Sequence, residues 1–353
     1  MTSSAPVGRL LSARYFLNDP ATSQPASIQT FLLPQGTNAL RFNELNFELD
    51  LDSIVLGQNG VALGHRYLRS GVKEGVVQFS YDGFEVAGMT SQGTSKHESD
   101  DAVWMAYGNG QIVSVVVDGS GGYSGGHEMA SIFALGVDEA FVDALLCGRQ
   151  VTSAELFDAG RKACLLGRER LKEKYPNQQY PAGAVASIVV VGGIYGSIAH
   201  HGDVIVLSSE NDSITGCTIV NRNGEGHLTR SVVDDNEHGS TLDLSGVGQG
   251  LIIATDGAIT ELGADSLLWR CTNEYLNDRG RGQCDKSAVR RLEAVLKRAK
   301  TSADFVRTAA SLKDQALGGD HTTCVRIKRV APFGASGLVT RSDLISKGMV
   351  KMV

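Results

Sequence analysis

Acidic residues at the boundaries of apolar runs constrain this chain more than any other feature. Asp118 ends the run VSVVVDG, Asp256 ends LIIATDG, and Asp320 precedes TTCVRI, while Asp100 and Asp101 lie together in KHESDDAVW. A strand end is a rigid position for a carboxylate, and several converging carboxylates are unfavourable unless a cation neutralises them. Oxygen ligands of this kind suit magnesium or manganese. The pattern therefore predicts a metal-dependent hydrolase.

The composition is that of an ordinary globular protein. The chain has 353 residues, of which 42% are hydrophobic and 20% charged, enough for one large or two ordinary domains. Its formal net charge of -6 offers no basic surface for nucleic acid. The six cysteines include no CxxC pair, so neither a disulfide framework nor a thiolate zinc site is expected.

No targeting or membrane segment is predicted. The start, MTSSAPVGRLLSARYF, lacks the basic and apolar segments of a secretory signal, and no long apolar run could span a membrane. We expect a cytoplasmic protein without membrane or nucleic-acid partners.

The N-terminal third is predicted to be an irregular arm over residues 1–35, followed by a β-rich extension over 36–83 of unknown role. Residues 45–51 alternate between apolar and polar, as in a half-buried strand. Turn signals at 58–60 and at Asp82-Gly83 indicate two hairpins. The extension could also be a separate β module that recruits a partner.

From residue 84 the pattern predicts strands and helix pairs in alternation. Helices are expected over 127–146 and 152–175, the second beginning with a capping box formed by Thr152 and Glu155. Strands follow, then helices over 287–300 and 302–313, a strand over 322–330 and a C-terminal tail over 331–353. This order favours an α+β sandwich of sheets covered by helices.

Several motifs resemble those of the PPM-type, or type 2C, metal-dependent serine/threonine protein phosphatases, in a divergent, bacterial-like form. DGSGGYSGGHEMAS, from Asp118 to Ser131, resembles the DGxGGxxxGExAS signature with one residue inserted. SDDA stands for the family's NEDA, and AGAVASIVVV with IAHHGDVIVL resembles the strand pair that leads to GDSR. LIIATDGAIT and GGDHTTCVRI match the two last blocks, so the resemblance covers residues 84–330.

The resemblance implies a β-sandwich of two mostly antiparallel sheets flanked by helix pairs, and two Mn²⁺ or Mg²⁺ ions that activate a water against a phosphate ester. Lys96 would bind the phosphate and Asp101 would orient the water. The implied metal ligands are Asp118 as the bridge, the Gly119 carbonyl, Asp256 and Asp320 at the first ion, Asp100 near the second, and Asp203 at a third, weaker site. A phosphorylated protein is the implied substrate, with a cognate kinase or regulatory partner reached through the N-terminal region.

The chain departs from the family at several of these positions. Lys96 replaces an arginine and loses its bidentate geometry, and Asp100 replaces a longer glutamate. Val204-Ile205 stands for the SR of GDSR, and His321 for an asparagine. The alternative function is therefore a catalytically weak pseudophosphatase that acts as a binding or regulatory module.

Each motif also has a plain structural interpretation. Asp-Gly pairs form turns, Asp100 and Asp101 could be solvated loop acids, and Lys96 could be a surface lysine. His200 and His201 are adjacent in a predicted strand and must point to opposite faces, which favours a structural role for both.

Overall fold

The computed structural model describes residues 8–13, 29–34, 50–57, 62–70, 75–91, 100–119, 125–174, 176, 183–192, 195–218, 231–233, 240–244, 250–261, 286–313, 321–330 and 349–351. Their strands form two sheets, and every strand pair described is antiparallel.

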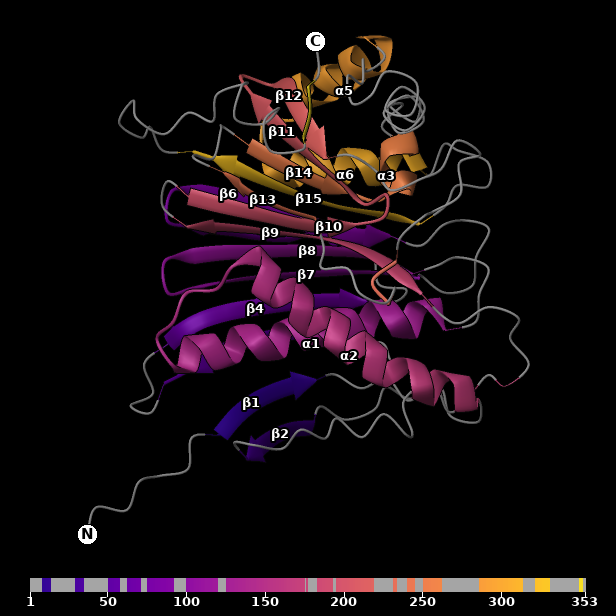
Figure 1. The fold of residues 1–353 in the computed structure, drawn as a ribbon. Helices are drawn as coiled ribbons and strands as arrows, with labels where there is room; N and C mark the ends of the chain where they lie inside the picture. Colours follow the sequence, from indigo (N-terminus) through magenta and orange to yellow (C-terminus); the bar gives the residue numbers. More distant parts are fainter. Residues whose placement is uncertain are drawn as a thin grey trace.

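The larger sheet has nine strands (Figure 1). In spatial order they are β13 (Ser240–Leu244), β10 (Tyr195–His201), β9 (Ala184–Gly192), β8 (Gln111–Gly119), β7 (Asp101–Gly108), β4 (Ala62–Ser70), β3 (Asp50–Leu56), β1 (Gly8–Ala13) and β2 (Gln29–Pro34).

The second sheet has seven strands. Their order is β16 (Met349–Lys351), β12 (Ser213–Thr218), β11 (Ile205–Glu210), β14 (Gly250–Ala254), β15 (Thr322–Arg329), β6 (Phe84–Ser91) and β5 (Val77–Tyr81).

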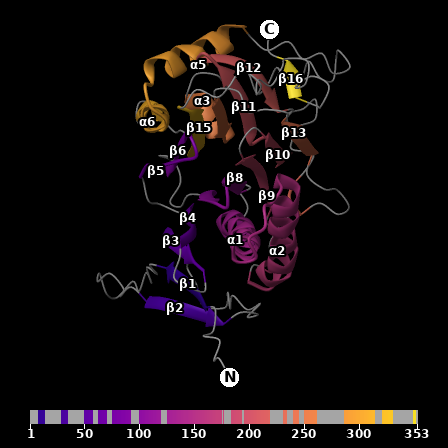
Figure 2. The ribbon, with the colours of Figure 1, turned by 90° about the vertical axis from the view of Figure 1, so that its left-hand side faces the viewer.

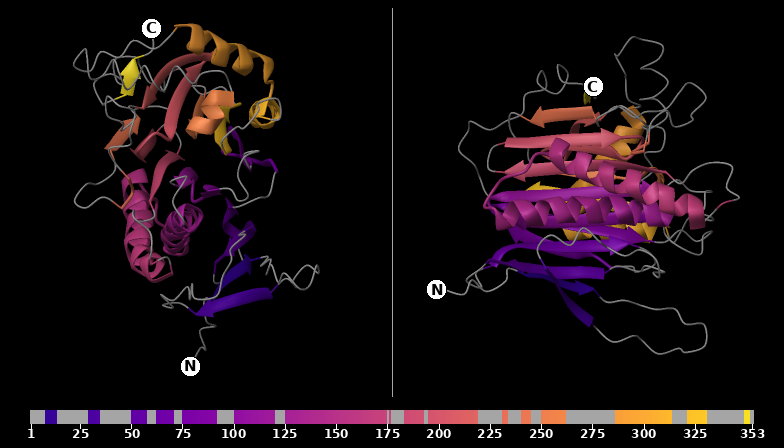
Figure 3. Two further views of the ribbon diagram at one scale, coloured as in Figure 1. Left: turned by 90° about the vertical axis from the view of Figure 1, so that its right-hand side faces the viewer. Right: turned by 60° about the horizontal axis from the view of Figure 1, so that its bottom comes forward.

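Helices cover the outer face of each sheet (Figure 2). The pair α1 (Gly126–Leu146) and α2 (Ser153–Lys174) packs on the nine-stranded sheet. The other side carries α3 (Asp256–Glu261), α5 (Lys286–Arg298) and α6 (Ser302–Lys313). The layer order is therefore helices, sheet, sheet, helices, which the left view of Figure 3 also displays.

Three apolar layers hold these elements together, because each sheet has one face toward helices and one toward the other sheet. Trp104, Phe133 and Phe157 lie in the layer under α1 and α2. The layer between the sheets contains Val116 and Val325. A third layer fills the space between the seven-stranded sheet and the helices α5 and α6.

The predicted α+β sandwich with flanking helix pairs is confirmed, as are both hairpins. The second turns at Asp82 and Gly83, both with positive φ, 47° and 79°. The capping box also forms. The backbone N–H of Thr152 donates to Glu155 Oε2 at 2.8 Å, and the N–H of Glu155 donates to Thr152 Oγ1 at 3.2 Å.

The prediction of an irregular arm over residues 1–35 was wrong for two segments, β1 and β2, which pair with each other. Their apolar runs are short, and only pairing between distant segments turns such runs into strands. In the same way, residues 349–351 of the predicted tail pair with β12. The strand predicted over 45–51 lies mostly outside the described residues.

The division of the chain between residues 83 and 84 stays a prediction. Strands on both sides of it are paired, since β4 pairs with β7 and β5 with β6. Within the described part of the chain, no helix is long and apolar enough to cross a bilayer.

Candidate metal centre

Three of the predicted site residues lie at one end of the nine-stranded sheet. Asp100 directly precedes β7, Asp101 begins it, and Asp118 lies opposite Asp101 near the end of β8. Residues directly opposite each other on paired strands point to the same face of a sheet. Asp101 is buried, whereas Asp100 and Asp118 are half-buried. The strand pairing therefore brings these acidic positions together.

Gly119 forms the tightest backbone packing at this end. Its N–H donates to the Asp100 carbonyl at 3.1 Å. A Cβ at Gly119 would lie 2.4 Å from the carbonyl oxygen of Gly126 and 2.5 Å from that of Asp100. Only glycine fits between the strand end and the start of α1, so this residue type is required sterically.

The seven-stranded sheet supplies a further acidic residue, Asp256. Asp256 begins α3, separated by one residue from the end of β14, and its Oδ1 accepts a hydrogen bond of 2.7 Å from the Gly257 N–H. Asp256 is half-buried, while the residues on either side of it are buried. The carboxylate is thus fixed at the junction between a central strand and a helix.

Three buried threonines tie the neighbouring strand ends together. Thr255 donates its N–H to the Thr323 carbonyl at 3.0 Å, and Thr323 donates its N–H to Thr255 Oγ1 at 3.2 Å. The hydroxyls of Thr90 and Thr323 are 2.8 Å apart. These bonds hold the ends of β6 and β14 against the start of β15.

The two sheet ends meet at His321. Its Nε2 lies 3.9 Å from Oδ2 of Asp100, and the two side chains are only 2% and 19% exposed. His321 precedes β15 in one sheet and Asp100 precedes β7 in the other. The contact therefore brings the Asp100–Asp118 end of one sheet to the Asp256 end of the other.

Asp203 lies at the same end, in the connection between β10 and β11, and is 2% exposed. Ile205, two residues later, is paired with Ala254, two residues before Asp256. Gly202, with φ of 92°, allows the sharp turn that this connection makes.

Two predicted site residues, Lys96 and Asp320, lie outside the described residues. Among those that are described, no three His, Cys, Asp or Glu side chains form a group that could hold a metal ion. Of the oxygen donors that the resemblance implies, the structure describes the carboxylates of Asp100, Asp118, Asp203 and Asp256 and the Gly119 carbonyl. Such oxygen donors fit Mg²⁺ or Mn²⁺ by their chemistry.

The structural interpretation of His200 and His201 agrees with their surroundings, since both are buried. The His201 ring lies edge-on to Phe157 at 5.2 Å, and its Nδ1 is 3.3 Å from the Ser231 carbonyl oxygen.

Sequence reasoning assigned no role to Thr90, Thr255 and Thr323. Their only signal is their position near strand ends, in GMTS, ATDG and HTTC, where hydroxyls often bond to neighbouring backbone.

Comparison with known proteins yields structural matches only. No family model matches the chain, and no curated protein does. Among solved structures, a bacterial serine phosphatase superposes with a TM-score of 0.53 at 14% identity, covering 70% of this chain and 99% of its own. The Mycobacterium tuberculosis serine/threonine phosphatase PstP/Ppp gives a TM-score of 0.52 at 14% identity, covering 70% and 99%. The S. agalactiae serine/threonine phosphatase gives 0.50 at 14%, covering 69% and 99%. The chain thus has the PPM-type phosphatase fold.

Proposed function

We propose that this chain, which has the PPM-type phosphatase fold, hydrolyses phosphoserine and phosphothreonine in proteins with the help of two Mg²⁺ or Mn²⁺ ions. The observation that carries the proposal is the meeting of the Asp100–Asp118 end of one sheet with the Asp256 end of the other at His321. These are the positions at which the sequence resembles the metal-binding motifs of the family.

The residues take separate roles in this proposal. Asp118 and the Gly119 carbonyl hold the ions from the nine-stranded sheet, Asp256 and Asp320 from the other side, and Asp203 serves a third, weaker site. Bound there, two divalent cations supply an activated water and neutralise the charge that develops on the phosphoryl oxygens.

The remaining polar side chains position the reactants. Asp101 accepts a hydrogen bond from the attacking water and fixes its orientation, which its burial at the strand pair supports. Lys96 binds the phosphate as a point charge, without the two-pronged geometry of an arginine. Asp100, held near His321, completes the acidic edge beside the second ion.

The test is hydrolysis of p-nitrophenyl phosphate and of a phosphothreonine peptide with Mn²⁺ or Mg²⁺. We expect Asp118→Ala and Asp256→Ala to lower the rate by more than about 100-fold, because each removes a ligand. Isothermal titration with Mn²⁺ should show the same variants binding less metal.

The matched control is Asp143→Asn. Asp143 is exposed near the end of α1, and that end of the helix packs on Gly64 and Gly108, at the opposite end of the sheet from Asp118. Its substitution should leave the rate unchanged. If the wild-type protein hydrolyses neither substrate with any divalent ion, the chain is a binding module and the proposal is wrong.

A further inference from the structure

The two sheets differ in lateral extent on the side of β5. The seven-stranded sheet ends at β5 in the described part of the chain. The nine-stranded sheet continues past β4 through β3, β1 and β2, which Figure 2 shows below β5 and β6. One face of β3 and β4 therefore extends beyond the edge of the opposing sheet.

That face is partly exposed and carries aliphatic and aromatic side chains together with one carboxylate, Asp52, whose Oδ1 lies 2.7 Å from His65 Nε2. On β3 and β4, Ile54 is paired with His65, so their side chains lie on one face, and Ile54 is 49% exposed. The His65 ring stacks on Tyr67 at 4.5 Å, and Tyr67 stacks on Phe79 of β5 at 5.5 Å. We call Ile54, His65, Tyr67 and Phe79 the aromatic shelf. It runs from the edge strand β5 outward over β4 and β3.

The backbone of β5 offers hydrogen bonds along the same edge. Tyr81 and Phe84 close a two-residue turn and form a hydrogen-bonded pair. Hydrogen-bonded and non-hydrogen-bonded pairs alternate along an antiparallel ladder. The N–H and C=O groups of Gln78 and Ser80 therefore point outward, away from β6, where a further strand would pair.

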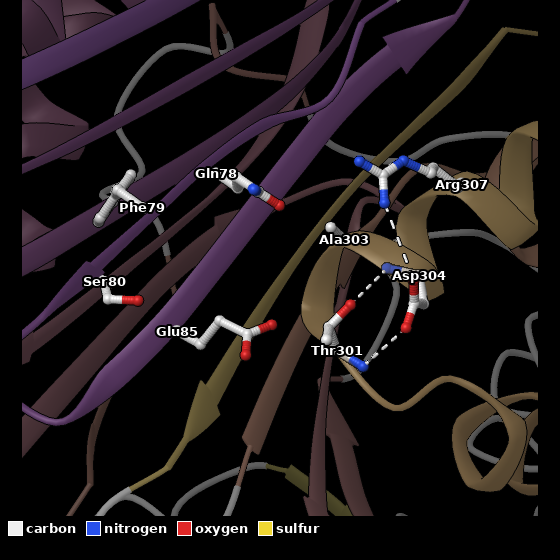
Figure 4. Close-up of a pocket in the computed structure, with 8 residues that line it drawn as sticks. All are labelled: Gln78, Phe79, Ser80, Glu85, Thr301, Ala303, Asp304 and Arg307. Atoms are coloured by element: carbon white, nitrogen blue, oxygen red, sulfur yellow. Dashed lines mark hydrogen bonds and ion pairs between the residues drawn. The ribbon is translucent and has the colours of Figure 1, made fainter.

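On the other face of β5 lies a pocket of about 490 Å³. Figure 4 shows Gln78, Ser80 and Glu85 on its strand side, and Thr301, Asp304 and Arg307 on its α6 side. Its charged lining consists of two carboxylates, Glu85 and Asp304, and one guanidinium, Arg307.

The carboxylates of the pocket are placed by hydrogen bonds. Glu85 accepts one from the Ser302 N–H, and Asp304 Oδ2 accepts one of 3.1 Å from the Thr301 N–H. Hydrogen bonds from the Thr301 side chain and backbone lower the pKa of Asp304. Asp304 Oδ1 also lies 3.8 Å from Arg307 Nη1, so these two charges compensate each other. The Glu85 carboxylate is left in the lining to complement a basic side chain.

From these three features we infer that β5 is a docking edge for an extended segment of a partner protein in which apolar and basic residues alternate. The segment adds to β5 as an eighth strand and pairs with Gln78 and Ser80. Its apolar side chains cover the aromatic shelf, and its basic side chains enter the pocket beside Glu85 and Asp304. This interaction surface goes beyond the proposed function and uses none of the residues at the metal centre.

The test measures the binding of a fluorescent peptide in which valine and lysine alternate. Two other peptides serve as comparisons: one in which valine and glutamate alternate, and one in which the same valines and lysines stand in separate blocks. We expect saturable binding of the valine–lysine peptide alone, and shifts of the Gln78 and Ser80 amide resonances. Ser80→Pro removes an outward N–H without breaking the β5–β6 ladder, and proline is tolerated on edge strands. It should weaken binding about five- to tenfold, whereas the matched control Ser80→Ala keeps the N–H and should bind normally.

A second pair of measurements separates docking from general attraction to an acidic protein. Asp304→Asn keeps the helix cap, and it should weaken binding of the valine–lysine peptide but not of a valine–glutamine peptide. Equal binding by Ser80→Pro and wild type would overturn the inference, as would the absence of any shift at Gln78 and Ser80. If sedimentation shows that the wild-type protein is a dimer and that Ser80→Pro is a monomer, the strand that pairs with β5 comes from a second copy of this chain. The inference of a separate partner protein would then be wrong.

Discussion

Nε2 of His321 lies 3.9 Å from Oδ2 of Asp100, across the boundary between the two sheets. Both side chains are largely buried. The pair links the two halves of the candidate centre, and it involves a histidine where the family motif has an asparagine. The structure therefore places this departure from the motif at the boundary between the two sheets.

We predict that His321→Ala lowers phosphatase activity about tenfold, because Asp100 loses a neighbour that fixes its orientation. His321→Asn restores the residue type of the family motif and should remain within a few-fold of wild type. Steady-state kinetics over a series of Mn²⁺ concentrations measure both. Unchanged metal dependence in His321→Ala would show that the contact does not position Asp100.

Gly119→Ala should abolish activity and destabilise the fold by about 1–3 kcal/mol, because the added Cβ meets backbone atoms that have no room to move. Gly75→Ala is the matched control, since a Cβ there meets nothing within 4 Å. Urea denaturation and the rate of phosphate release measure the two effects. Activity near wild type in Gly119→Ala would contradict the close packing at the start of α1.

The buried pair of Arg66 and Asp138 should anchor β4 to α1. Arg66 Nη1 donates to Asp138 Oδ2 at 2.9 Å, and Trp104 Nε1 donates to Oδ1 of the same carboxylate at 3.0 Å. Arg66→Met leaves a buried carboxylate without its ionic partner and should cost about 3–5 kcal/mol of unfolding free energy.

The control for this change is the double variant Arg66→Met with Asp138→Leu. Replacing both charges by apolar side chains should recover much of the loss, because no buried charge remains. Chemical denaturation of the three proteins gives the comparison. If Arg66→Met alone is as stable as wild type, β4 is not held to the phosphatase fold through this pair.

We predict that ionisation of Tyr67 makes the free energy of unfolding depend on pH in the alkaline range. Burial, then the charges of Tyr107 and Asp52, raise the pKa of Tyr67 to about 12. An unfolded tyrosine titrates at about 10. The folded state holds the proton more tightly, so this contribution to stability is complete below about pH 10 and is lost as the pH rises to about 12.

Tyr67→Phe removes the titrating group, so its unfolding free energy should fall less steeply than that of wild type over the same pH window. Denaturation curves at several pH values, with ultraviolet titration of the tyrosines, measure the difference. Parallel curves for the two proteins would show that Tyr67 ionises normally in the folded chain.

Local signals in the sequence were enough to predict much of the fold. The Asp82-Gly83 turn takes positive φ at both residues, which is what a two-residue hairpin requires, and the Thr152–Glu155 capping box forms with both reciprocal bonds. The apolar runs that end at Asp118 and near Asp256 are strands, as expected. Each of these features depends on residues close together in the chain.

Contacts between residues far apart in the chain could not be predicted from the sequence. Arg66 carries no local sign of burial, because its partner Asp138 is 72 residues away. The strands β1 and β2 depend on each other and on β3. The contact between His321 and Asp100 requires the two sheets to be stacked before it exists. None of these follows from periodicity or turn chemistry.

The threonine bonds of the seven-stranded sheet and the Gly119–Asp100 bond of the other make each half of the centre rigid within its own layer. The separation between Asp118 and Asp256 is then governed by the stacking of the layers. Val116 and Val325 belong to the apolar layer that sets this spacing. Removing a methyl group from that layer would let the two sheets pack closer together. The distance between the Asp118 and Asp256 carboxylates would then change, although the substituted residue contacts neither of them.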